Sequence, residues 1–134
     1  MRLLGIDFGE RRIGIAVSDE EGLLAFPKEV ILNENSAVSK IATLVLENEI
    51  EKIVFGLSQN SEGVENKIME TAKKFADELK TITAKEVVFQ NEAFSSFHAH
   101  NEKFAVTEQN TNKDIDASAA AIILQRYIDN SYYK

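Results

Sequence analysis

The sequence contains no cysteine and no tryptophan, and its 134 residues include a single proline, Pro27. A chain without thiols can form no disulfide, thiolate zinc site or cysteine nucleophile, and this composition is compatible with a reducing compartment. Its longest apolar run, near residues 119–124, is far shorter than the ~20 residues that span a bilayer. The start MRLLGIDFGE reaches Asp7 before any apolar stretch of signal-peptide length. We therefore expect a soluble cytoplasmic protein that does not associate with membranes.

Positive charge is also scarce, because 15 lysines and arginines face 22 aspartates and glutamates, for a net charge of −7. This balance argues against the broad basic face of a passive nucleic-acid binder. Arginines do occur near the start, at positions 2, 11 and 12. The lysines between positions 67 and 80 are interpreted as the solvated face of a helix. Any anionic partner must then be held by few contacts or through a metal ion.

The order of the elements follows from the hydrophobic pattern, and no repeat or linker divides the chain, so we expect one domain over residues 1–134. Strands joined by tight turns form an antiparallel meander, whereas strands joined through helices run parallel. The pattern therefore predicts an α/β fold with a five-stranded mixed sheet and helices on both faces. The predicted strands are 3–8, 13–18, 24–32, 53–57 and 86–90, and the predicted helices are 36–49, 64–80, 94–104 and 115–129, with Ser36 as the first N-cap.

Asp7 is the first candidate site residue, because it places a carboxylate inside a strand that is expected to be buried on both faces. Burial of an unpaired charge is costly, so such a residue calls for a partner or a ligand. Gly5 and Gly9 would allow a ligand or a second backbone to come close. The alternative is an ordinary aspartate at a strand end, bonded to the amides of Gly9 or Arg11.

Two further carboxylates stand out. Asp116 heads a helical stripe that continues through Ala120 and Ile123, and Asp114 fits the N-cap of that helix better than Asp116 does. Glu92 follows the last predicted strand, where the sites of open α/β sheets collect, although an exposed loop glutamate is the plain alternative. Carboxylates from these elements can converge around Mg²⁺ or Mn²⁺, which prefer oxygen ligands. Such cations would also bridge to phosphates that the acidic chain repels.

Other chemistries have little support in the sequence. The two histidines, His98 and His100, are two residues apart and cannot share one face of a helix. The chain has no HExxH motif, no Walker A motif and no GxSxG nucleophile elbow. Zinc hydrolysis, P-loop nucleotide binding and serine hydrolysis are therefore not expected.

Taken together, several motifs resemble the YqgF family, also called RuvX, of pre-16S rRNA nuclease and Holliday junction resolvase-like proteins. They occur in the family's order and spacing across almost the whole chain. The resemblance implies a ribonuclease H-like fold and a nuclease dependent on Mg²⁺ or Mn²⁺. Its substrate would be the ends of pre-16S ribosomal RNA, or branched DNA. The motifs are GIDFG at 5–9, RIGIAVSD at 12–19, KIVFGL at 52–57, NEAFSS at 91–96 and DASAA from 116, followed by LQRY at 124–127.

The resemblance also implies the roles of individual residues. The catalytic and metal-binding carboxylates would be Asp7, Glu92 and Asp116, with Asp7 shared between two cations about 4 Å apart. The nucleic-acid strand would be contacted by the few cations available. These are Arg11, Arg12 and Lys113. We expect a monomer or a weak homodimer.

The chain departs from the usual family pattern at Asn91 and Ala93, where members carry aspartate and arginine on either side of the glutamate. Loss of the arginine removes a fork suited to a phosphate. A second interpretation is therefore a non-catalytic ribosome-assembly module that kept the fold and lost its grip on nucleic acid. A third is a relative of the sugar kinase, actin and chaperone ATPases, whose first strands look similar but which need two such domains to enclose ATP.

Overall fold

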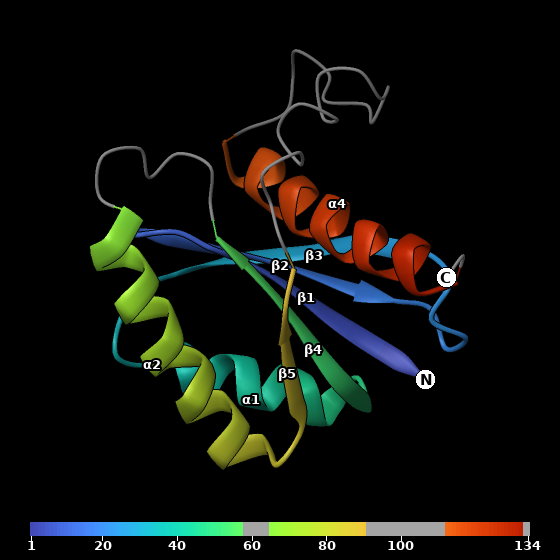
Figure 1. The fold of residues 1–134 in the computed structure, drawn as a ribbon, viewed down its shortest axis with the longest axis horizontal. Coiled ribbons are helices and arrows are strands. Elements are labelled where there is room, and N and C mark those ends of the chain that lie inside the picture. Colours follow the sequence, from blue (N-terminus) through green and yellow to red (C-terminus); the bar gives the residue numbers. More distant parts are fainter. Residues whose placement is uncertain (58–64, 91–111, 133–134) are drawn as a thin grey trace.

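A mixed five-stranded sheet forms the centre of the molecule, and helices cover both of its faces (Figure 1). The computed structural model describes residues 1–57, 65–90 and 112–132, with 65–67, 112–117 and 132 described by their helical backbone alone. The elements, in chain order, are β1 (Arg2–Phe8), β2 (Arg12–Ser18), β3 (Ala25–Leu32), α1 (Ala37–Glu47), β4 (Ile50–Leu57), α2 (Glu65–Thr83), β5 (Glu86–Phe89) and α4 (Asn112–Tyr132).

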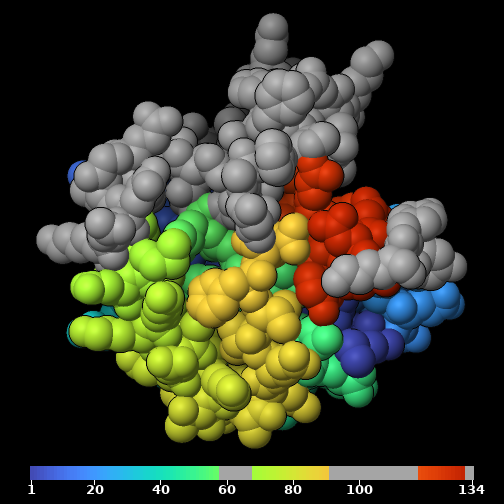
Figure 2. All heavy atoms as spheres, in the orientation of Figure 1, coloured from blue at the N-terminus to red at the C-terminus, as the bar shows by residue number. Residues whose placement is uncertain are grey.

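The strand order is β3-β2-β1-β4-β5, with β1 at the centre. Tight turns make β2 antiparallel to β1 and to β3, whereas β4 runs parallel to β1 and β5 runs parallel to β4. This confirms the mixed sheet expected from the sequence. The edge strand β5 is partly exposed, and in Figure 2 it lies at the surface between α2 and α4.

Alternation along β1 divides the core into two layers. Leu4, Ile6 and Phe8 are fully buried in the larger cluster, which β1 shares with α1 and α2. Leu3 points the other way and belongs to the cluster beneath α4. Residues 5 and 7 must therefore also face α4, because they have the same parity as Leu3.

Aromatic side chains pack against the end of β1 on the face covered by α1 and α2. The ring of Phe8 lies 5.4 Å from the ring of Phe55 on β4 and 5.1 Å from that of Phe75 on α2. Phe55 in turn lies 5.3 Å from Phe89 on β5. Such ring pairs add stability beyond their buried area, so they fix the strand end that carries Asp7.

Several predicted boundaries move because two residues other than glycine adopt left-handed backbone angles. Glu49, with φ of 54°, turns the chain after α1, and β4 begins at Ile50 rather than at residue 53 because Ile50 pairs with Arg2. Ala84, with φ of 58°, ends α2 after Thr83 rather than after residue 80. Glycine is the usual signal for such turns, and neither position carries one.

The predicted helix starts were partly wrong. Ser36 does precede α1, but its hydroxyl contacts Glu34 Oε1 at 3.2 Å and makes no capping bond to the helix. The helix α4 begins at Asn112, so Asp114 lies in its first turn and is not the N-cap. An acidic residue in the first turn still interacts favourably with the helix dipole, which is why the sequence signal resembled a cap. The helix predicted at 94–104 lies outside the described residues.

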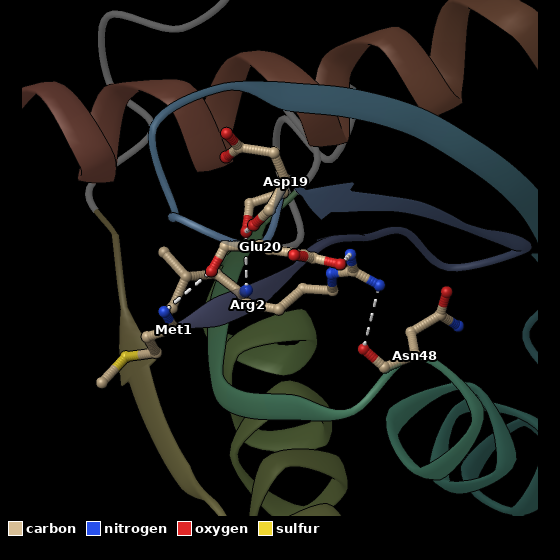
Figure 3. Close-up of polar contacts among 7 residues, drawn as sticks. Met1, Arg2, Asp19, Glu20 and Asn48 are labelled. Atoms are coloured by element: carbon tan, nitrogen blue, oxygen red, sulfur yellow. Dashed lines mark hydrogen bonds and ion pairs between the residues drawn. The ribbon is translucent and has the colours of Figure 1, made fainter.

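The N-terminus is tied to the loop between β2 and β3 (Figure 3). The Met1 ammonium donates to the carbonyl oxygen of Glu20 at 2.9 Å, and Arg2 lies 3.5 Å from the Glu20 carboxylate. Arg2 also reaches the carbonyl oxygen of Asn48 at 3.5 Å. Gly22 has φ of +72°, and a Cβ there would lie 2.6 Å from the Met1 carbonyl oxygen, so only glycine fits this loop.

Asp19 organises the same loop, because its Oδ1 accepts hydrogen bonds from the amides of Leu23 at 2.7 Å and Leu24 at 3.1 Å. These bonds, the one from Leu24 first, lower the pKa of Asp19 from its usual 3.8. A lowered folded-state pKa stabilises the protein above the unfolded-state pKa, and this contribution is lost as pH falls through the folded-state pKa.

We predict that Asp19→Ala lowers the melting temperature at pH 7, and that the gap to the parent narrows as pH falls below about 4, near the unfolded-state pKa, and continues to close through the lower folded-state pKa. Thermal unfolding followed by circular dichroism between pH 3 and 7 measures the gap. Asp77→Ala, at an exposed aspartate on α2, controls for loss of a surface charge. A gap that stays equally large at pH 3 would contradict the assigned role.

Candidate active site

Asp7 lies near the end of β1, on the face covered by α4, and is only 6% exposed. Its direct neighbours in both adjacent strands are glycines, namely Gly14 on β2 and Gly56 on β4. Since directly paired residues project to the same face, neither adjacent strand places a side chain beside the carboxylate at this level. The Asp7 carboxylate is therefore flanked in the sheet by two glycines without side chains, which allow a ligand to come close.

The helix α4 crosses β1 at Gly5, two residues before Asp7. A Cβ at Gly5 would lie 2.8 Å from the Cβ of Leu124 and 3.0 Å from the carbonyl oxygen of Ala120. Both of these residues are fully buried. The helix can rest directly on the strand because glycine and alanine meet at the crossing.

The direction of α4 is set by contacts near its C-terminal end. The Gln125 side chain accepts from the Ala25 amide at 2.9 Å and donates to the Leu23 carbonyl oxygen at 3.1 Å. Lys52, which pairs with Leu3 at the start of β1, donates to the Tyr127 hydroxyl at 3.0 Å. The helix therefore runs antiparallel to β1, as Figure 1 shows, with its N-terminal end over the end of β1 that bears Asp7.

The anchor at Lys52 is electrostatic as well as geometric. Its hydrogen bond to Tyr127, with a further contribution from Glu86 at 3.5 Å, raises the pKa of the Lys52 amine above its usual 10.5. The ammonium also lies 5.6 Å from the centre of the Tyr127 ring. Because the raised pKa favours the charged form, this contact is retained at neutral pH and is lost only as pH rises through the pKa of the folded state.

Position 116 follows from this geometry at the level of the backbone. One helical turn of about four residues advances ~6 Å, and two strand residues advance about 6.6 Å. A step from Gly5 to Asp7 along the strand therefore matches a step from Ala120 back to Asp116 along the helix. The backbone of α4 brings position 116 to the end of the sheet that holds Asp7.

The remaining predicted site residues, the metal ligands Asp116 and Glu92 and the substrate-binding Lys113, are described only in part or not at all. Asp116 and Lys113 lie in α4, and their side chains are outside the described part of the chain, as is the whole of Glu92 together with the neighbouring Asn91 and Ala93. Among the described side chains, no three of histidine, aspartate or glutamate gather as metal ligands. The cluster of three carboxylates therefore stays a prediction.

The two predicted substrate-binding arginines lie where the turn after β1 leads into β2, with Arg11 in the turn and Arg12 as the first residue of β2. Arg11 and Arg12 are both exposed. The Gly9 amide closes the turn by donating to the Arg12 carbonyl oxygen at 3.0 Å. Asn33, directly after β3, donates from its backbone amide to the Arg11 carbonyl oxygen at 2.8 Å and from its side chain to the Gly9 carbonyl oxygen at 2.7 Å. The arginines thus lie on an ordered turn at the same end of the sheet as Asp7.

Sequence reasoning missed three residues of this region: Gly14, Gly56 and Asn33. The two glycines acquire meaning only through the strand register that pairs both with Asp7. Asn33 acts through contacts with residues more than twenty positions away in the chain. No local pattern signals either arrangement.

Within the described residues, no helix is long and apolar enough to cross a membrane.

Comparison with known proteins gives consistent results. The family model described as "RuvX: Holliday junction resolvase" matches residues 1–130. A protein of Sulfurihydrogenibium sp. (strain YO3AOP1) named "Putative pre-16S rRNA nuclease" is 38% identical, over 96% of this chain and 90% of its own length. Proteins of the same name from Clostridium tetani and Streptococcus thermophilus are 33% and 32% identical, and in both cases the match covers at least 98% of this chain and 100% of the relative.

Solved structures agree in fold. Thermus thermophilus RuvC in complex with a Holliday junction substrate superimposes with a TM-score of 0.66 at 15% identity, over 98% of this chain and 96% of RuvC. The fowlpox virus Holliday junction resolvase superimposes with a TM-score of 0.51 at 13% identity, over 97% of this chain and 99% of the resolvase. At these identities the likeness establishes the ribonuclease H-like fold expected from the sequence.

We predict that Gly5→Ala destabilises the protein by about 1–3 kcal/mol, because the added methyl overpacks the crossing with α4. In an unobstructed strand the same change would stabilise the protein by roughly 0.5–1 kcal/mol, since alanine loses less backbone entropy than glycine. Urea denaturation measures the difference in unfolding free energy. An alanine variant as stable as the parent would show that the crossing is not tight.

Proposed function

The chain belongs to the RuvX family, and on that premise we propose that it is a metal-dependent nuclease that hydrolyses phosphodiester bonds at the ends of pre-16S ribosomal RNA. The observation that carries the proposal is the buried carboxylate of Asp7, set between Gly14 and Gly56 at the end of the sheet to which α4 brings position 116. The names of the relatives supply the substrate. The exclusions made from the sequence are consistent with the same activity, because the chain has no cysteine, no HExxH motif and no GxSxG motif.

The residues of this region fit Mg²⁺ or Mn²⁺. Both are hard cations that prefer oxygen ligands, and the proposed ligands are the three carboxylates Asp7, Glu92 and Asp116. Asp7 is a carboxylate that lies almost fully buried at the end of the central strand, and carboxylate oxygens are ligands that these cations prefer. The bare backbone at Gly14 and Gly56 leaves space beside it for a ligand and a substrate phosphate.

The roles of the residues follow from their chemistry. When bound, divalent cations supply the Lewis acidity and positive charge that phosphodiester hydrolysis requires. Asp7 would hold them from the strand, while Glu92 and Asp116 would complete the ligand set. Arg11 and Arg12 would bind the phosphates of the nucleic-acid strand through their forked guanidinium groups. Lys113, in the first turn of α4, would add a third positively charged side chain.

The net charge of −7 also shapes substrate binding. Few cations are available, so we propose that nucleic acid binds weakly and that its affinity falls steeply with salt. The bound metal ions would offset part of the repulsion between the acidic chain and the phosphates. We further propose that the protein acts in the cytoplasm as a monomer or a weak homodimer.

A second candidate function is the resolution of branched DNA, which the description of the matching family favours. Parallel cleavage assays on a pre-16S rRNA fragment and on a four-way DNA junction, each with Mg²⁺ and with Mn²⁺, separate the two substrates. Cleavage of the rRNA precursor alone would support the first proposal, and cleavage of the junction alone would support the second. A chain that cleaves neither substrate would be the non-catalytic assembly module.

We predict that Asp7→Asn reduces metal-dependent cleavage by at least about a hundredfold, the scale seen when one charge-stabilising group is removed. The fold should be retained or gain stability, because the change removes a buried charge at nearly constant volume. Initial cleavage rates and melting temperatures are measured together. Asp19→Asn, the same change in a loop at the opposite end of β2, is the matched control, and undiminished cleavage by Asp7→Asn would refute the site.

We also predict that Mn²⁺ raises the melting temperature of the parent, because a ligand that binds only the folded state stabilises it. At a hundred times its dissociation constant the gain is about 2.7 kcal/mol. The gain should vanish in Asp7→Asn and in Asp116→Asn, and should persist in Asp19→Asn. Differential scanning fluorimetry with increasing Mn²⁺ measures it, and a parent that shows no shift would favour the non-catalytic interpretation.

A further inference from the structure

Asn33 links three segments that meet beside the candidate active site. It directly follows β3, and its side chain is partly buried. The side-chain amide donates to the carbonyl oxygen of Gly9, at the end of β1, and the backbone amide donates to the carbonyl oxygen of Arg11, just before β2. One residue thus connects β3 to both ends of the turn between β1 and β2.

The side-chain bond is short, at 2.7 Å, and it requires a donor. A carbonyl oxygen can only accept, so an aspartate at this position would place its lone pairs against those of Gly9. The bond also restrains a glycine, the residue whose backbone is otherwise the freest to change conformation. The side-chain amide of Asn33 therefore restrains the turn at Gly9, the residue with the greatest backbone freedom.

The turn matters because it carries Arg11 and leads directly into Arg12, the first residue of β2. Both side chains are exposed, and each arginine presents a planar fork that binds a phosphate only in a suitable orientation. In a chain with a net charge of −7, binding of nucleic acid depends on the placement of these few cations. The backbone of Asp7 is held by strand pairing on both sides, with Gly14 and Gly56.

We propose that Asn33 is a positioning residue, which holds the turn between β1 and β2 so that Arg11 and Arg12 face the nucleic-acid strand beside Asp7. This role rests on the proposed nuclease function, because it concerns the affinity of the same site for its nucleic-acid substrate. It predicts an effect on nucleic-acid affinity that is separate from metal binding and from overall stability.

The test compares Asn33→Leu with Asn48→Leu. Asn48 is the matched control, because its side-chain amide also donates to a backbone carbonyl oxygen, that of Leu44 at 2.8 Å, and it is also partly buried. It lies at the end of α1, away from the turn. The binding of each protein to a fluorescent single-stranded RNA fragment is measured without divalent metal at several salt concentrations. Melting temperatures are recorded with and without Mn²⁺.

Asn33→Leu should weaken RNA binding by about tenfold relative to Asn48→Leu, as expected when two charge-assisted contacts are misplaced. The slope of log affinity against log salt should also become shallower, by up to about 1.4 for two lost phosphate contacts on a single strand. The stabilisation by Mn²⁺ should persist in both variants. A general loss of structure would lower the melting temperature without this selective change in salt dependence.

A double-mutant cycle identifies the path of the effect. In a chain that already carries Arg11→Gln and Arg12→Gln, Asn33→Leu should change affinity by less than about twofold, because its partners are gone. Should Asn33→Leu fail to fold, Asn33→Ala removes the same donor with a smaller side chain and is used in its place. Affinity equal to that of the Asn48 control, or an undiminished effect in the background that lacks Arg11 and Arg12, would overturn the role of Asn33 while leaving the nuclease intact. A parent that neither binds RNA nor cleaves it would overturn both.

Discussion

The close contact between α4 and β1 at Gly5 is the constraint on which the rest of the candidate site depends. A helix normally stands off a sheet by the length of the side chains between them, and here the interposed residue has none. Contacts of Gln125 and Lys52 then set how far along the sheet the helix lies. Because the helix is held in this position, Asp7 and position 116, more than a hundred residues apart in the chain, come to the same end of the sheet.

The same arrangement reconciles a buried charge with a stable fold. Asp7 occupies the central strand, where an unpaired carboxylate would be costly. The aromatic packing of Phe8 and Phe55 on the opposite face stabilises this strand end without involving the carboxylate. Both faces of β1 are therefore packed, and the proposed chemistry belongs to the face that carries Asp7. The acidic composition is compatible with the proposed activity, because that activity needs only a few well-placed basic side chains together with bound metal ions.

Some features were predictable because their causes are local. The nearly continuous apolar run around Asp7 predicts a strand buried on both faces, and tight turns and helical stripes predict the mixed sheet; the structure confirms both. The starts of β4 and α4 were placed wrongly, because Ile50 joins its strand by pairing with Arg2 and Asp114 imitates a cap from inside the helix. The metal-binding roles of Asp7, Glu92 and Asp116 remain predictions.

The sequence by itself determined the kinds of residue available: a carboxylate in a buried strand, few cations, no thiol, and a set of motifs that belongs to one family. Periodicity and composition act over short distances, so they can be read without knowledge of the fold. Only the tertiary structure decided which residues surround Asp7. Strand register pairs it with Gly14 and Gly56, and Asn33, from the end of β3, bonds to the turn between β1 and β2 beside it. These contacts join distant parts of the chain, and their geometry exists only once the sheet has formed and α4 has packed against it.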